Sequence, residues 1–145
     1  MTQSSKRNLD AVKSYFQEID QGRFPQELFT ADFEFYFPKF GVGRGAEDFW
    51  ELATGMFASG NKVGHVRESF RFIEDGRHVV IEGATYGTNS EGVAWKGGET
   101  PGGRFCSTFD FNEQGLIERM YVYIDPDYAG ADKARFYWKR ANPIW

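Results

Sequence analysis

The chain has 145 residues, a net charge of −4 and an isoelectric point near 5.2. This length predicts a single domain over residues 1–145. The acidic balance argues against nucleic-acid binding, which needs a basic face, and no apolar run reaches the roughly 20 residues of a membrane span. Aromatic residues make up 18% of the chain, 15 of them Phe, which predicts a thick apolar interior or a pocket lined by flat side chains.

The cysteine count and the N-terminal composition indicate the cellular setting. Cys106 is the only cysteine, which excludes an internal disulfide and a zinc cluster of thiolates. The first ten residues, MTQSSKRNLD, are polar and lack the apolar segment of a secretory signal. We therefore expect a cytoplasmic protein.

The first predicted element is a helix over residues 4–21. Gly22 follows it where a C-cap glycine is expected. Residues 25–30 have room for one more helical turn. The apolar stripe of the long helix holds Leu9, Val12, Tyr15, Phe16 and Ile19.

A strand, a loop and a second helix follow. Residues 33–38 read FEFYFP and predict a strand that Pro38 ends or marks as an edge. Residues 39–45 predict a glycine-rich loop. Residues 46–59 predict a helix that Gly60 and Asn61 stop, and its apolar side holds Phe49, Trp50, Ala53, Met56 and Phe57.

Residues 62–74 and 77–90 predict a long hairpin. The dipeptide Asp75-Gly76 is a strong turn signal, and a two-residue loop pairs Phe72 with Val79 and Glu68 with Gly83. This register places His65 and Tyr86 together on the outer, polar face. A bulge in either strand would exchange the faces beyond it.

Residues 104–125 predict a second hairpin, turned at residues 112–115, where Gly115 supplies the left-handed backbone. The predicted pairs include Ser107 with Met120 and Phe105 with Val122. Because strand faces alternate with period two, the inner face holds Phe105, Ser107, Phe109, Phe111, Met120, Val122 and Ile124. Residues 91–103 predict a glycine-rich rim that carries Trp95, and residues 129–140 predict a last helix.

The order of these elements predicts an α+β architecture, because helices come early and antiparallel strands late. The strands after Lys62 are long enough to curve. A curved antiparallel sheet wrapped on the two N-terminal helices leaves a cone with one open end.

Three stretches resemble the nuclear-transport-factor-2-like (NTF2-like) superfamily and, within it, the SnoaL-like polyketide cyclase branch. They are Tyr15-x4-Asp20-x-Gly22, the run from Pro38 through the glycine loop to residues 45–47, and FNEQGLIERMYVYIDPDY at residues 111–128. The resemblance implies a cone with a small-molecule cavity, often dimerised through the convex sheet face. It does not fix a reaction, since this fold serves isomerases, cyclases, dehydratases, epoxide hydrolases and binding modules.

The resemblance is uneven at the level of single residues. Tyr15 matches the hydroxyl donor that ketosteroid isomerases place on the first helix. Their first-strand carboxylate is replaced here by Phe37-Pro38, and their protonated carboxyl falls near Ser107. Asp125 is close to the inward aspartate of SnoaL-type cyclases, but its parity makes it face outward.

Three residues are candidates for catalysis. The Tyr15 hydroxyl would polarise a carbonyl, or it belongs to a core tyrosine. Glu68 would be an isolated carboxylate among apolar residues with a raised pKa, suited to general acid–base work, or it is solvated after a register slip. His65 suits proton transfer by its ordinary pKa, or serves an outer-face contact.

We expect a larger set of residues to line the cone. For each of them, packing in the core is the alternative. This set is Tyr36, Trp50, Thr85, Phe105, Ser107, Phe109, Met120 and Val122. The chain has two histidines and no acidic cluster beside them, so we expect no metal site and no cofactor.

Together these patterns predict a protein that binds an apolar or aromatic small molecule. As an enzyme it would carry out cofactor-free isomerisation, cyclisation or dehydration next to a carbonyl. The alternative is a non-catalytic ligand-binding or assembly module of the same fold. We also expect a homodimer through the outer sheet face, around Tyr86, Cys106, Tyr121 and Tyr123.

Overall fold

The computed structural model describes residues 3–136 and 140–145. In this part of the chain no helix combines the length and the apolar character needed to cross a membrane. The helices are α1 (Gln3–Asp20), the 3-10 turn η1 (Gln26–Leu28), α2 (Gly45–Ala58) and the 3-10 turn η2 (Lys133–Arg135). The strands are β1 (Phe29–Phe37), β2 (Gly41–Arg44), β3 (Lys62–Asp75), β4 (His78–Thr88), β5 (Ala94–Lys96), β6 (Arg104–Phe111) and β7 (Ile117–Ile124).

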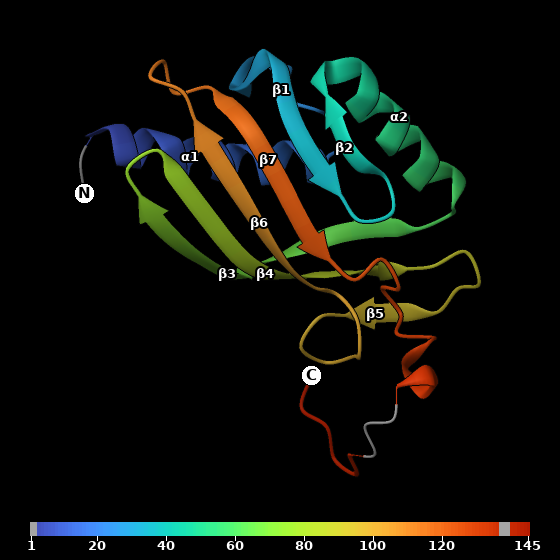
Figure 1. The fold of residues 1–145 in the computed structure, drawn as a ribbon. Helices are drawn as coiled ribbons and strands as arrows, with labels where there is room; N and C mark the ends of the chain where they lie inside the picture. The colour runs from blue at the N-terminus through green and yellow to red at the C-terminus, as the bar shows by residue number, and fades with distance from the viewer. Residues whose placement is uncertain (1–2, 137–139) are drawn as a thin grey trace.

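The strands form one curved sheet in the order β2-β1-β7-β6-β4-β3, with β5 paired to β4 (Figure 1). β1 runs parallel to β7, and the other pairs are antiparallel. Side chains from α1, α2 and the inner sheet face line a common cavity, so both helices lie on the concave side. The predicted α+β cone is confirmed.

The buried residues of each helix and strand recur with the period of that element, so that one face of it is buried. Val12 and Phe16 of α1 are almost fully buried, and they meet strand residues such as Phe109 and Phe111, which expose nothing to solvent. In the β6–β7 hairpin, Ser107 pairs with Val122 instead of Met120. This register differs from the predicted one by two residues. Because side chains alternate with period two, the predicted inner face is unchanged.

The β3–β4 hairpin differs more. Asp75 pairs with His78, so near the turn the register is again shifted by two residues. A bulge then interrupts the pairing between Val66 and Arg71, and beyond it His65 pairs with Thr85. The interruption changes the parity of β3, which turns His65 to the inner face and corrects the predicted outer position.

The bulge is held by the hydroxyl of Ser69. This hydroxyl donates to the carbonyl of Val66 at 2.6 Å and accepts the backbone N–H of Ala84 at 2.9 Å. Ala84 is 4% exposed, so its N–H has little access to water. A side chain therefore replaces the ladder bond that the bulge removes.

Two predicted segments are wrong. Residues 39–45 are not only a loop, because residues 41–44 form β2, whose backbone pairs with the edge of β1. Residues 129–136 hold only turns and η2 instead of a helix, and residues 137–139 of that prediction lie outside the described residues. The carboxylate of Asp127 accepts the backbone N–H groups of Ala131 and Asp132, and such local bonds compete with helix formation.

Replacing Ser69 with Ala tests the bulge. The N–H of Ala84 would lose its partner while still buried, so we expect the free energy of unfolding to fall by about 1–3 kcal/mol. Urea denaturation followed by circular dichroism measures this change. Ser90→Ala is the control, because Ser90 is exposed and should change stability by less than about 0.5 kcal/mol. Equal stability of Ser69→Ala and the native protein would contradict the role of this hydroxyl.

Candidate functional site

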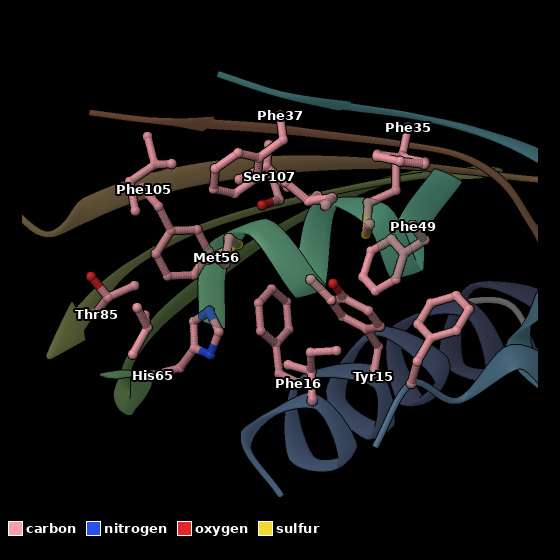
Figure 2. A pocket seen from close by; sticks show the side chains of 18 of the residues that line it. Tyr15, Phe16, Phe35, Phe37, Phe49, Met56, His65, Thr85, Phe105 and Ser107 are labelled. Atoms are coloured by element: carbon pink, nitrogen blue, oxygen red, sulfur yellow. The ribbon is translucent and has the colours of Figure 1, made fainter. Parts of the chain in front are cut away.

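The cavity between the helices and the concave sheet face has a volume of about 190 Å³. Its wall is largely aromatic and aliphatic, and Figure 2 shows rings from α1, α2 and the sheet pointing into one space. An apolar cavity of roughly 150 Å³ is enough to bind benzene. The enclosed part therefore has room for about one ring and its substituents.

Most of the residues predicted to line the cone are found in the wall of this cavity. They are Tyr36, Trp50, Thr85, Phe105, Ser107, Met120 and Val122. The ring of Tyr36, however, contacts Tyr121 and Tyr123, which lie on the outer face. Phe109 is not in the wall: it packs edge-to-face against Tyr15 at 5.7 Å and belongs to the solid core.

The strongest polar feature of the cavity is a pair between His65 and Asp20. Nδ1 of His65 lies 2.6 Å from Oδ1 of Asp20, and both side chains are 18% exposed. β3 supplies the histidine beyond its bulge, and the last residue of α1 supplies the carboxylate. Both residues belong to the cavity wall. A carboxylate accepts only, so Nδ1 carries the hydrogen and, in the neutral ring, Nε2 keeps a free electron pair.

Aromatic rings fix the orientation of His65. Phe16 and Phe105 lie edge-on to the imidazole at centroid distances of 4.8 and 5.3 Å. Figure 2 shows the imidazole beside these rings at the end of the cavity where Thr85 lies. The surroundings exclude much of the solvent, which strengthens the attraction between the ring and the Asp20 carboxylate.

Two hydroxyl groups lie in the same wall. Tyr15 is buried, and burial, followed by the charge of Asp20, raises the pKa of its hydroxyl well above the ordinary value. Tyr15 is therefore a neutral donor at physiological pH, and its hydroxyl points into the cavity (Figure 2). Ser107, 2% exposed, supplies the second hydroxyl from β6. A ligand oxygen placed between such donors would be polarised.

Glu68 is not part of the site. It lies within the bulge of β3 and is exposed, outside the cavity wall. The predicted inner position depended on an unbroken register with β4, and the bulge breaks that register. The apolar surroundings predicted for this carboxyl are therefore missing.

Asp20 was not among the predicted site residues, although it stands in a stretch that carries the family resemblance. One physical signal was available. A carboxylate in the last turn of a helix lies at the negative end of the helix dipole, which is unfavourable without a partner. His65, 45 residues further along the chain, supplies that partner.

A second group of side chains closes the wall near β5. The indole N–H of Trp95 donates to the Thr85 hydroxyl at 3.1 Å, and this hydroxyl donates to the carbonyl of Gly103 at 3.0 Å. The ring of Tyr128 stacks on Trp95 at a centroid distance of 5.0 Å. The Thr85 hydroxyl thus links the side chain of Trp95 to the backbone of Gly103. Burial raises the pKa of the Tyr128 hydroxyl to about 12.

Within the described ranges, no three or more His, Cys, Asp or Glu side chains gather in a way that would hold a metal ion. The polar side chains of the cavity wall include His65, Asp20, Tyr15 and Ser107. In the neutral ring, Nε2 of His65 can accept a proton, and the hydroxyl groups of Tyr15 and Ser107 can donate hydrogen bonds.

Comparison with known proteins places this fold. Residues 5–120 match the model of the SnoaL-like domain, as the resemblance in the sequence predicted. A candidate polyketide cyclase from Xanthomonas campestris pv. campestris superposes with a TM-score of 0.71 at 15% identity, covering 84% of this chain and 93% of that one. An NTF2-like protein from Anabaena variabilis reaches a TM-score of 0.68 at 24% identity, covering 89% and 97%.

One similar structure carries a described reaction. SalBIII, an epoxide hydrolase/cyclase-like enzyme of pyran ring formation in the polyether salinomycin, superposes with a TM-score of 0.64 at 17% identity, covering 88% of this chain and 97% of SalBIII. No curated protein matches the sequence. At these identities the structural similarity establishes the NTF2-like fold.

Replacing Tyr128 with Phe tests the burial of this side chain through the pH dependence of stability. The pKa of Tyr128 is raised from 10.0 to about 12 in the fold, so the neutral hydroxyl is favoured there. The resulting stability is complete below pH 10 and is lost as the pH rises toward 12. By pH 11 the native protein should have lost about 1.4 kcal/mol more than Tyr128→Phe. Urea denaturation at pH 8, 10 and 11 measures the difference, and parallel losses would contradict the burial.

Proposed function

The chain is a member of the SnoaL-like domain family, and from this premise we propose that it binds an apolar or aromatic carbonyl compound and moves a proton on it without a cofactor. The small cavity and its aromatic wall support a compact apolar ligand. The observation that carries the catalytic part is the contact of 2.6 Å between His65 and Asp20 at the edge of this cavity.

Each group has a defined task in the proposed reaction. Nε2 of His65 takes a proton from the carbon next to the ligand carbonyl, and Asp20 stabilises the imidazolium that forms. Tyr15 donates a hydrogen bond to the carbonyl oxygen as negative charge develops there, and Ser107 adds a second bond. His65 then returns the proton, to another carbon in an isomerisation or to a departing oxygen in a dehydration.

Ring closure belongs to the same class of chemistry. Once the proton has left, the carbon can attack a second carbonyl of the same ligand, and the imidazolium protonates the new alkoxide. The description of SalBIII as an enzyme of pyran ring formation supports a cyclisation within this fold. The wall of the cavity would hold the folded ligand away from water.

A non-catalytic ligand-binding module is the second candidate. It is favoured by Phe37-Pro38, which occupy the end of β1 where the ketosteroid isomerases of this superfamily carry a carboxylate base. The exposed position of Glu68 removes a further carboxylate from the cavity. In this reading the pair of His65 and Asp20 orients a bound ligand and transfers no proton.

We further propose a cytoplasmic homodimer that forms through the outer sheet face. Tyr36, Tyr121 and Tyr123 pack together on this face, and Tyr123 is 50% exposed. Aromatic residues are enriched at protein interfaces. The lone Cys106 fits the reducing cytoplasm.

Hydrogen–deuterium exchange tests the proposed chemistry. In D₂O, the native protein should accelerate exchange at the carbon next to the carbonyl of small aromatic ketones such as acetophenone and 1-indanone, measured by proton NMR. Because general-base catalysis contributes roughly 10²–10⁴-fold, His65→Asn should lose at least about 100-fold. Asp20→Asn should lose less, and Tyr15→Phe should lose activity without losing ligand binding.

The chain offers a matched control for this experiment. His78 lies 2.8 Å from Asp110, but its side chain is 61% exposed and outside the cavity. His78→Asn should leave the exchange rate unchanged, and so should Glu68→Gln. If a ketone binds to the native protein and its exchange rate stays at the level of buffer, the non-catalytic alternative holds.

Sedimentation tests the homodimer. We expect the native protein to sediment as a dimer at micromolar concentration, and Tyr123→Glu to shift it toward monomer by placing charge in the interface. Val93→Glu is the control, because Val93 is 46% exposed in the segment before β5, which pairs with β4, whereas the tyrosine cluster lies on β1 and β7. A native protein that is monomeric at this concentration would contradict the proposed dimer.

A further inference from the structure

α2 presents two apolar stripes to the cavity. Phe49 and Leu52 are buried and form the inner wall. Trp50, Ala53 and Phe57 also belong to the wall, and their spacing of i, i+3 and i+7 puts them on one side of the helix. This second stripe faces solvent, with Trp50 49% and Phe57 73% exposed. It marks the mouth of the cavity.

The other side of the mouth comes from distant parts of the chain. Gly22 and Phe24 follow α1, and Asn61 and Val63 stand at the start of β3, all in the same wall. The ring of Phe24 meets Trp50 edge-on at a centroid distance of 6.4 Å. The mouth is thus lined mainly by apolar side chains, which come from α2, from the segment after α1 and from the start of β3.

Large apolar side chains exposed beside a cavity are typical of a binding groove. Neither Trp50 nor Phe57 belongs to the core cluster, so packing of the core does not account for their size. α2 rises about 1.5 Å per residue, so these two side chains are spaced about 10 Å along its axis. An extended alkyl chain of roughly eight carbons covers that length.

Charge at the mouth limits what the ligand can carry there. Arg23, next to Gly22, is already paired with Glu18 and Glu27 at 2.5 and 2.8 Å. It is therefore engaged and not a ready partner for an anionic end group. The carboxylate of Asp20 lies in the same wall. These charges favour a neutral group over an anion.

We propose that the natural ligand is a carbonyl compound with one ring and a neutral, apolar tail of about six to eight carbons. The ring and its carbonyl occupy the enclosed chamber beside Tyr15. The tail leaves through the mouth and lies along Trp50, Ala53 and Phe57. This inference rests on the proposed function for the ring and the carbonyl, and on the exposed stripe of α2 for the tail.

A series of n-alkyl phenyl ketones, from acetophenone to decanophenone, tests the tail by titration calorimetry. Burying one methylene contributes about 0.8 kcal/mol, so the dissociation constant should fall up to about fourfold per added carbon. The gain should level off near eight carbons, where the chain passes Phe57. In the double variant Trp50→Ala, Phe57→Ser the affinity should become nearly independent of tail length.

The control variant is Ile73→Ser, because Ile73 is 51% exposed on β3 and outside the cavity wall. It should keep the full dependence on tail length. If the native protein binds all ketones equally, the proposed binding of a tail along α2 is wrong and the proposed function still stands. A dependence that survives in the double variant would also overturn the tail. Failure of every ketone to bind would overturn both the tail and the proposed function.

Discussion

The site depends on how the backbone of β3 is interrupted between Val66 and Arg71. An unbroken strand would put His65 on the outer face beside Tyr86, in water and far from any ligand. The bulge changes the parity of the strand, and the Ser69 hydroxyl satisfies the backbone groups that lose their strand partners. As a result the histidine reaches the carboxylate at the end of α1. One local irregularity thus brings the first helix and the sheet together in a single polar pair.

The limited access of solvent to His65 and Asp20 distinguishes this pair from a similar pair on the surface. Among the described residues, two contacts join a histidine to an aspartate, with similar distances of 2.6 and 2.8 Å. The pair of His78 and Asp110 stands on the surface, where water screens the charges and such contacts contribute little. The pair of His65 and Asp20 stands among phenylalanine rings at the edge of a cavity. The many aromatic residues of the chain therefore matter because their rings exclude water from the cavity. In such surroundings each polar interaction is stronger than it is on the surface.

The polarity of the cavity wall changes from its interior to its mouth. Polar groups converge inside, where Tyr15 and Ser107 face the enclosed space, and apolar side chains continue outward along α2. This gradient comes from one helix that turns two neighbouring stripes toward the same space. It accounts for both proposals, because the enclosed groups suit a carbonyl and the exposed stripe suits what is attached to it. The NTF2-like fold supplies the frame, and in both proposals these side chains would select the ligand.

Much of the fold can be predicted from the sequence, because the patterns that predict helices and strands span only short stretches of the chain. The stripe of α1, the alternation in β6 and β7 and the family resemblance all led to the cone. The two-residue error in the second hairpin was harmless, since it keeps every side chain on its face. The bulge, the exposure of Glu68, the depth of Phe109 and the contact of Asp20 with His65 were not readable in this way. They depend on how segments distant in sequence pack, and one odd-numbered shift in strand pairing is enough to exchange the inside and the outside of a strand.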